Sequence, residues 1–117
     1  MDLRFKNRRL EKRCNDFTKL VQKYGQNNAK WITRRLNQLS AMPNLAVALK
    51  LPQLRCHELE GDRKGQLAVD VRQPFRLVFE VDQDPVPKKE DGGLDWTKVE
   101  AIKIIAIEDY HGKRKKK

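Results

Sequence analysis

Two histidines are the side chains of this sequence best suited to moving protons, and reactive neighbours surround both. His57 precedes a turn-rich segment, and His111 directly follows Asp109 and Tyr110 after an apolar run. Metal-free cleavage of RNA needs a base that removes the proton of a ribose 2′-hydroxyl and an acid that protonates the leaving 5′-oxygen. Histidine suits either role because its pKa lies near neutrality. The two histidines are therefore candidates for proton transfer.

Other side chains could complete such a site. Arg72 and Arg76 flank a Gln-Pro turn, where a guanidinium could hold two oxygens of one phosphate. Tyr110 could stack on a splayed base or orient a water, and Asp109 could fix a histidine tautomer or accept a proton. The same residue types also serve purely structural ends, since strand arginines commonly form salt bridges. Residue types alone therefore leave catalysis as one alternative.

The distribution of charge points to a polyanionic partner. The net charge is +10, and residues 1–56 carry 13 basic and 3 acidic side chains, whereas residues 57–112 carry 8 and 13. A lysine- and arginine-rich face gains free energy by displacing the counterions of nucleic-acid phosphates. Basic surfaces and tails can also serve solubility alone. As candidate RNA contacts the charge pattern indicates Arg8, Arg9, Arg34, Arg35 and Lys113.

Several classes of site and location are disfavoured by the sequence. It contains no glycine-rich phosphate loop, no paired-cysteine metal motif and no serine-hydrolase motif. Cys14 and Cys56 lie in unrelated contexts, so we expect reduced thiols, no metal and no cofactor. No apolar run reaches the roughly 20 residues of a membrane span, and the start of the chain lacks the apolar core of a signal peptide. We therefore expect a cytoplasmic protein.

The first half of the sequence predicts a strand and two helices. Residues 1–5 alternate apolar and polar side chains, as a short edge strand does. Residues 8–24 place apolar side chains on one helical face and basic side chains around the rest, and Gly25 suits the end of that helix. We expect one amphipathic helix there, packed antiparallel to a second helix that follows directly.

That second helix has its own start and stop signals. Asn27 or Asn28 could cap its beginning through a side-chain oxygen, and Pro43 stops it. Its apolar residues recur at helical spacing, which leaves Arg34 and Arg35 predicted on the exposed side. The helix pair would thus present a basic outer surface.

The second half changes to a period of two. Residues 53–59 alternate up to a turn-rich segment at 60–65, and residues 67–71 and 75–81 read as antiparallel neighbours joined by the Gln-Pro turn. We expect three such strands to form most of a small sheet.

The end of the sequence completes the fold prediction. Residues 82–96 are rich in proline, glycine and charge, so we expect a long exposed loop, and residues 99–107 are apolar on both faces, as a central strand is. The predicted fold class is α+β, with a short N-terminal strand and two antiparallel helices packed on a small, mainly antiparallel sheet. We expect one domain over residues 1–112 and a disordered basic tail over 113–117.

Three segments carry a resemblance to a known family. They read CHELEGDR at 56–63, VDVRQPFRLVF at 69–79 and IEDYH at 107–111. Together they resemble a HigB-type toxin of the RelE/ParE superfamily, the toxins of type II toxin–antitoxin systems. The resemblance covers nearly the whole chain in element order. The sequence departs from many relatives at Glu60, where they carry a lysine, and in a longer segment over 82–96.

The resemblance implies a function and roles for individual residues. It implies a RelE-like toxin that enters the ribosomal A site, cleaves mRNA there without a metal, and is held inactive by an antitoxin. His57 and His111 resemble the proton-transfer residues, with Asp109 and Tyr110 completing the group and Arg72 holding the scissile phosphate. It further implies supporting RNA contacts from Arg63, Lys64 and Arg76.

Two other functions stay open at this point. One is a non-catalytic ParE-like toxin that binds DNA gyrase, and the other is a basic RNA-binding module without catalysis. The nuclease hypothesis requires His57, His111 and Arg72 to converge on one phosphate. Loss of the cellular effect when His111 is replaced would separate a nuclease from a binder.

Overall fold

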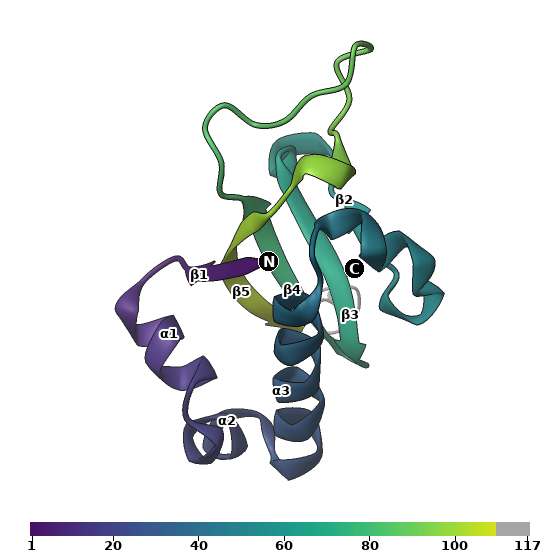
Figure 1. Ribbon diagram of the computed structural model, residues 1–117. Helices are drawn as coiled ribbons and strands as arrows, with labels where there is room; N and C mark the ends of the chain where they lie inside the picture. The colour runs from purple at the N-terminus through teal and green to yellow at the C-terminus, as the bar shows by residue number, and fades with distance from the viewer. Residues whose placement is uncertain (110–117) are drawn as a thin grey trace.

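The structure is a computed structural model that describes residues 1–109. The predictions for Tyr110, His111 and Lys113, and for a tail over 113–117, lie outside the described residues. The described chain is α+β, with an N-terminal strand and helices packed on a five-stranded, mainly antiparallel open sheet (Figure 1). The predicted fold class is therefore confirmed.

The sheet brings the first and last strands of the described chain side by side. In spatial order its strands are β1 (Asp2–Phe5), β5 (Ala101–Asp109), β4 (Phe75–Val81), β3 (Gln66–Arg72) and β2 (His57–Glu58). β1 pairs with β5 in parallel, and every other pair is antiparallel. The predicted edge strand, central strand and β3–β4 hairpin are all confirmed.

The predicted strand over residues 53–59 is mostly wrong. Pro52–Leu54 forms a 3-10 turn, and only His57 and Glu58 pair with β3. The physical reason is Arg55, whose φ of 45° lies in the left-handed region and interrupts an extended chain. His57 is consequently held on a two-residue strand directly after this kink.

The predicted first helix is two helices. α1 (Arg8–Cys14) and α2 (Phe17–Tyr24) are separated by Asn15 and Asp16. The backbone N–H of Asn15 closes α1, and the Asp16 side chain caps α2 by accepting from the Lys19 N–H at 3.3 Å. This side-chain cap offers the backbone an alternative to a continuous helix. Figure 1 shows that the two segments meet at an angle.

The third helix, α3 (Gln26–Ala41), is the long helix of the layer. Its N-cap is Gly25, and no side chain caps it, so the predicted cap through an Asn27 or Asn28 oxygen is wrong. The Asn28 amide instead donates to the Tyr24 carbonyl at 2.9 Å, which ties α3 back to α2. The helix ends before Pro43, as predicted.

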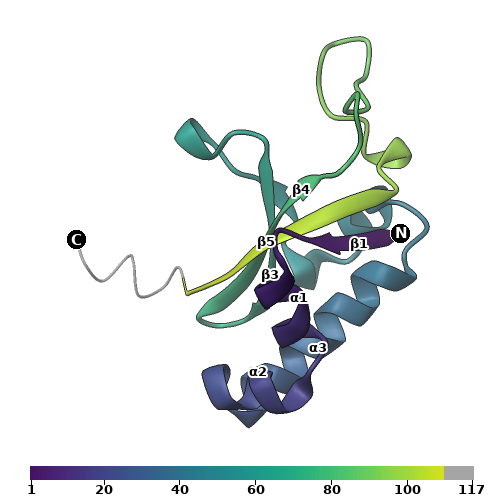
Figure 2. The ribbon, with the colours of Figure 1, turned by 90° about the vertical axis from the view of Figure 1, so that its left-hand side faces the viewer.

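All three helices lie on one side of the sheet (Figure 2). The core forms between them, from apolar side chains that alternate along β3 and β4, such as Val69 and Phe79, and from the inner face of α3, such as Ile32 and Leu39. The other side of the sheet, which we call the helix-free face, carries Ala68 and Asp70 of β3 together with the residues paired with them on β4 and β5. The alternation thus separates the core from a second, chemically different face.

A long loop leaves the far end of β4, as predicted for residues 82–96. It is held by a bridge between Lys88 and Leu94, and by Gln83, whose side-chain oxygen accepts from the backbone N–H groups of Glu100 and Ala101. A 3-10 turn at Trp96–Lys98 then leads into β5. No helix within residues 1–109 is long and apolar enough to cross a membrane.

Candidate active site

The helix-free face holds a three-residue ion cluster. Arg63 donates two hydrogen bonds to the carboxylate of Glu108, at 3.0 and 2.8 Å, and Arg76 donates two more, at 3.1 and 2.8 Å. The Arg63 and Glu108 pairing is bidentate, which fixes both planes. Asp70 is paired with Arg76 in the neighbouring strand, and its carboxylate forms a further ion pair with Arg55 at 3.5 Å, so acidic and basic side chains alternate around this place. The cluster therefore presents oriented cations on the helix-free face.

The environment of Glu108 shows how strongly the arginines act. Burial alone would raise the pKa of Glu108, but the hydrogen bonds from Arg63 and Arg76 outweigh that effect and lower it from 4.5 to about 2. The bond to Glu108 in turn raises the pKa of Arg63. Glu108 and Arg63 therefore both stay charged at neutral pH.

His57 lies on the same helix-free face, because it is paired with Ala68 across β2 and β3. Its Nδ1 lies 2.7 Å from the carbonyl oxygen of Arg55. A carbonyl oxygen only accepts, so Nδ1 must carry the proton and donate it. In the neutral ring the lone pair is then on Nε2, and the side chain is exposed. His57 is therefore held in the tautomer that a general base needs.

Arg72 and Asp109 lie at one end of the sheet. Arg72 pairs with Phe75, and Phe75 pairs with Asp109, so the three residues form one row across β3, β4 and β5. Arg72 is exposed and forms no ion pair within residues 1–109. The sheet thus places Asp109, at the end of β5, in the same row as the exposed Arg72, with one strand between them.

The structure does not bring His57 and Arg72 into direct reach of each other. His57 is paired with Ala68, and Arg72 is four residues further along β3, so the two rows lie about 13 Å apart along the sheet. The row that contains Arg76 and Glu108 is two residues from the Ala68 row, or about 7 Å. The ion cluster is therefore nearer to His57 along the strands than Arg72 is.

The prediction that Arg35 is exposed and contacts RNA is wrong. Only 4% of Arg35 is exposed, and its guanidinium donates to the carbonyl oxygens of Asp70 at 2.7 Å and Val71 at 3.1 Å. It also donates to the Gln38 side chain at 2.6 Å. Burial lowers the pKa of Arg35. Because all three of its guanidinium nitrogens donate to groups of its own chain, Arg35 acts within the fold.

The bonds of Arg35 fall where β3 is irregular. The register between β3 and β4 shifts between Asp70 and Arg72, which marks a β-bulge. Arg35 holds the two carbonyl groups of this bulge from α3 and so positions the residue that follows, Arg72. Sequence periodicity put Arg35 beside Arg34 on the outer face and gave no sign of this role.

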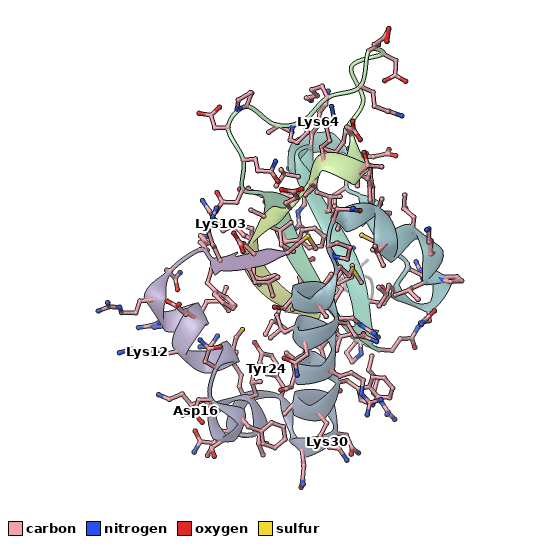
Figure 3. The ribbon with its side chains drawn as sticks, viewed as in Figure 1. Lys12, Asp16, Tyr24, Lys30, Lys64 and Lys103 are labelled. Carbon is pink, nitrogen blue, oxygen red and sulfur yellow. The ribbon has the colours of Figure 1, made fainter. Side chains whose placement is uncertain are left out.

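The other predicted RNA contacts are spread over the surface. Arg8 and Arg9 are exposed on α1, and Lys64 is exposed in the turn before β3 (Figure 3). Arg34 is exposed on α3, with its guanidinium 4.6 Å from the centre of the Trp31 ring. Apart from Lys64, these residues come from the helix layer and not from the helix-free face. They could only contact RNA that extends beyond the neighbourhood of His57.

Cysteine and metal chemistry have little support in the described chain. Cys14 and Cys56 are both free thiols, as predicted, and burial raises their pKa values to about 11 and about 12. Within residues 1–109 no group of three or more His, Cys, Asp or Glu side chains could hold a metal ion.

Comparison with known proteins adds no name to these observations: no protein-family model and no curated protein matches the chain.

Proposed function

We propose that this protein is a cytoplasmic RNA-cleaving toxin of the RelE/ParE kind, acting on mRNA at the ribosome and neutralised by an antitoxin. The observation that carries the proposal is His57, which is exposed on the same face as the Arg63, Arg76 and Glu108 cluster, with its Nδ1 proton donated to a carbonyl oxygen. An imidazole held in this tautomer can accept a proton only at Nε2. That is the requirement for a base in metal-free RNA cleavage.

The proposed reaction uses two proton transfers. His57 Nε2 takes the proton of the ribose 2′-hydroxyl, and the 2′-oxygen forms a bond to phosphorus as the bond to the 5′-oxygen breaks. His111 gives a proton to the leaving 5′-oxygen, so the products are a 2′,3′-cyclic phosphate and a 5′-hydroxyl. Cations near the phosphorus stabilise the extra negative charge of the transition state.

The spacing of the rows supports different phosphate contacts for the different arginines. Arg63 and Arg76 are proposed to face the scissile phosphate, because their cluster is nearer to the His57 row. Arg72, about 13 Å along the strand from the His57 row, is proposed to hold a neighbouring phosphate of the same RNA chain. This differs from the role that the family resemblance implies for Arg72, and the convergence of His57 and Arg72 on one phosphate, which the nuclease hypothesis from the sequence required, is not found.

Primer extension on mRNA from cells that briefly express the chain tests the proposal. The parent protein should give discrete cuts in translated regions, and His57→Ala and His111→Ala should each reduce them at least about 100-fold. Lys98→Ala, an exposed residue of the far loop, is the matched control and should keep the cuts. Growth arrest without cuts in the parent would refute cleavage, and a supercoiling assay with purified gyrase would then test the ParE-like alternative.

The tautomer of His57 can be measured separately. Nitrogen-15 NMR of the ring at a pH where it is neutral should show the proton on Nδ1 and a bare Nε2. The opposite tautomer would contradict the proposed base, whatever the cleavage assay shows.

A further inference from the structure

The break between α1 and α2 forms a hollow lined only by cations. Its volume is about 510 Å³, and its lining side chains are Arg8, Arg9, Lys12, Arg13 and Lys19. No carboxylate lines it, and within residues 1–109 none of these five side chains forms an ion pair with an acidic side chain. Five positive charges thus face one solvent-filled space without a counter-charge.

This arrangement works against the stability of α1. Arg8 and Lys12, and likewise Arg9 and Arg13, are four residues apart on the helix, and like charges at that spacing destabilise it. The Asn15–Asp16 break then turns α2 so that Lys19 faces the same hollow. Figure 3 shows Lys12 projecting from α1 away from the sheet. Local conflicts of this kind are expected where a ligand supplies the missing charge.

A second, smaller hollow adjoins the first. It has a volume of about 230 Å³ and shares Arg9 and Arg13 with the cationic hollow, so the two arginines form the ridge between them. Residues 105–107 of β5 and Tyr24 of α2 give it apolar and aromatic walls, and, besides the two shared arginines, Lys6 and Lys23 also line it. The ring of Tyr24 packs edge-on against Phe75, with 5.3 Å between the ring centres, and Arg13 acts electrostatically on the Tyr24 hydroxyl. The second hollow is therefore partly apolar and walled by a fixed aromatic ring.

We propose that these two hollows form a binding site for a nucleoside polyphosphate. The phosphate chain occupies the cationic hollow, where Arg8, Lys12 and Lys19 contact its oxygens. The base occupies the smaller hollow, against Tyr24 and the segment of β5 in its wall. The site lies in the helix layer and is separate from His57 and the ion cluster on the helix-free face.

Charge and shape favour this ligand class over simpler anions. One phosphate group carries at most about two negative charges and would leave most of five cations unneutralised. A triphosphate brings about four negative charges within a length that one hollow of this size can hold. A second compartment with an aromatic ring and an apolar strand segment in its wall, directly beside the charges, fits a ligand with a flat end that stacks. A backbone contact to duplex RNA has no use for that compartment, since its bases are stacked inside.

Calorimetric titration of the full chain with ATP, GTP and inorganic tripolyphosphate tests the proposal. Lys12→Gln/Lys19→Gln is the test variant, since both side chains are exposed and neither packs in the core. Lys50→Gln/Lys98→Gln removes the same charge from exposed positions outside the hollows and is the control. Thermal unfolding of both variants shows whether each is folded.

The proposal expects one saturable site for a nucleoside triphosphate, weakened about tenfold or more in the test variant and less than about twofold in the control. Tripolyphosphate should bind the same site about tenfold more weakly than the triphosphates. Equal losses in both variants would show general charge attraction and overturn the proposal. Tripolyphosphate binding as tightly as ATP and GTP would overturn the base site. If an RNA hairpin displaced bound ATP at a concentration well below the one at which ATP itself binds, the cationic hollow would be assigned to RNA instead.

Discussion

Basic side chains occur in two contrasting settings in this protein. On the helix-free face, Arg63 and Arg76 share the carboxylate of Glu108 through four hydrogen bonds. At the α1–α2 break, five cations line one hollow with no carboxylate among them. The first group is held in place by its own chain, whereas the second depends on solvent and counterions.

The difference separates two uses of positive charge. A guanidinium bound to a carboxylate has a fixed direction, which suits the stabilisation of charge that develops at one atom. Cations that are not paired with a carboxylate keep their full attraction for an anion, although their mutual repulsion destabilises the helix. Such a group suits the binding of an anionic ligand. The contrast therefore makes opposite predictions for substitutions in the two settings.

The largest effect is expected where an arginine is most completely enclosed by partners. Arg35→Leu should lower the free energy of unfolding by about 3 kcal/mol, because the carbonyls of Asp70 and Val71 lose their donors in a buried place. Urea denaturation followed by circular dichroism measures it. Arg34→Leu, one residue earlier and exposed, is the matched control and should cost less than about 1 kcal/mol. Equal losses would mean that the enclosed partners of Arg35 contribute little.

The ion cluster should show the next largest effect. Glu108→Gln should lower the free energy of unfolding by about 1–2 kcal/mol, because two partly buried guanidinium groups lose the charge that they share. The figure is kept below that of a fully buried pair because the side chains retain 14–29% exposure. Glu80→Gln, on β4 and outside the cluster, should change the unfolding free energy much less. A neutral outcome for Glu108→Gln would show that the cluster sets orientation alone.

The same carboxylate predicts a dependence of stability on pH. The pKa of Glu108 in the folded protein is about 2, below its ordinary 4.5, so its ionised form stabilises the fold. That contribution is fully present above about pH 4.5 and is lost as the pH falls towards 2. The free energy of unfolding, measured by urea denaturation, should therefore fall between pH 5 and pH 2 by about 1 kcal/mol less in Glu108→Gln than in the parent. Parallel curves would contradict the assignment.

The smallest effect, of opposite sign, is expected at the α1–α2 break. Lys12→Gln removes one like-charge neighbour of Arg8 and should raise the free energy of unfolding by about 0.3 kcal/mol at low salt. The gain should shrink in 0.5 M salt, which screens the repulsion. Thermal unfolding at the two salt concentrations checks this. A loss of stability would show that Lys12 has a structural partner.

Most of the fold could be predicted from the sequence, because the strands show up as patterns of apolar residues close together along the chain. Alternation over 67–71 and 75–81 predicts β3 and β4, and the doubly apolar run at 99–107 predicts β5 as a central strand. The break in the first helix was missed, although Asn15 and Asp16 are residues that favour helix ends. The helical periodicity of the flanking apolar residues continues across the break, and it therefore predicts one continuous helix.

Less of the candidate site could be predicted from the sequence, because its side-chain contacts join segments that are far apart along the chain. The helical pattern placed Arg35 outside, yet its partners are 35 and 36 residues away on β3. Glu108 went unnoticed beside Asp109, since its role follows from the pairing of β4 and β5. His57 was singled out by type, but its tautomer depends on the left-handed turn at Arg55. Spacing along the chain does not encode such pairings.

The shortness of β2 has a consequence for association between copies of the chain. Within residues 1–109, β2 pairs with β3 only at Leu67 and Ala68, so the rest of that side of β3 lacks a neighbouring strand. Unpaired strand edges invite pairing with other molecules and start aggregation. Arg35 occupies the carbonyls of Asp70 and Val71 in this stretch. One buried arginine thus also occupies carbonyl groups that another strand could otherwise bind.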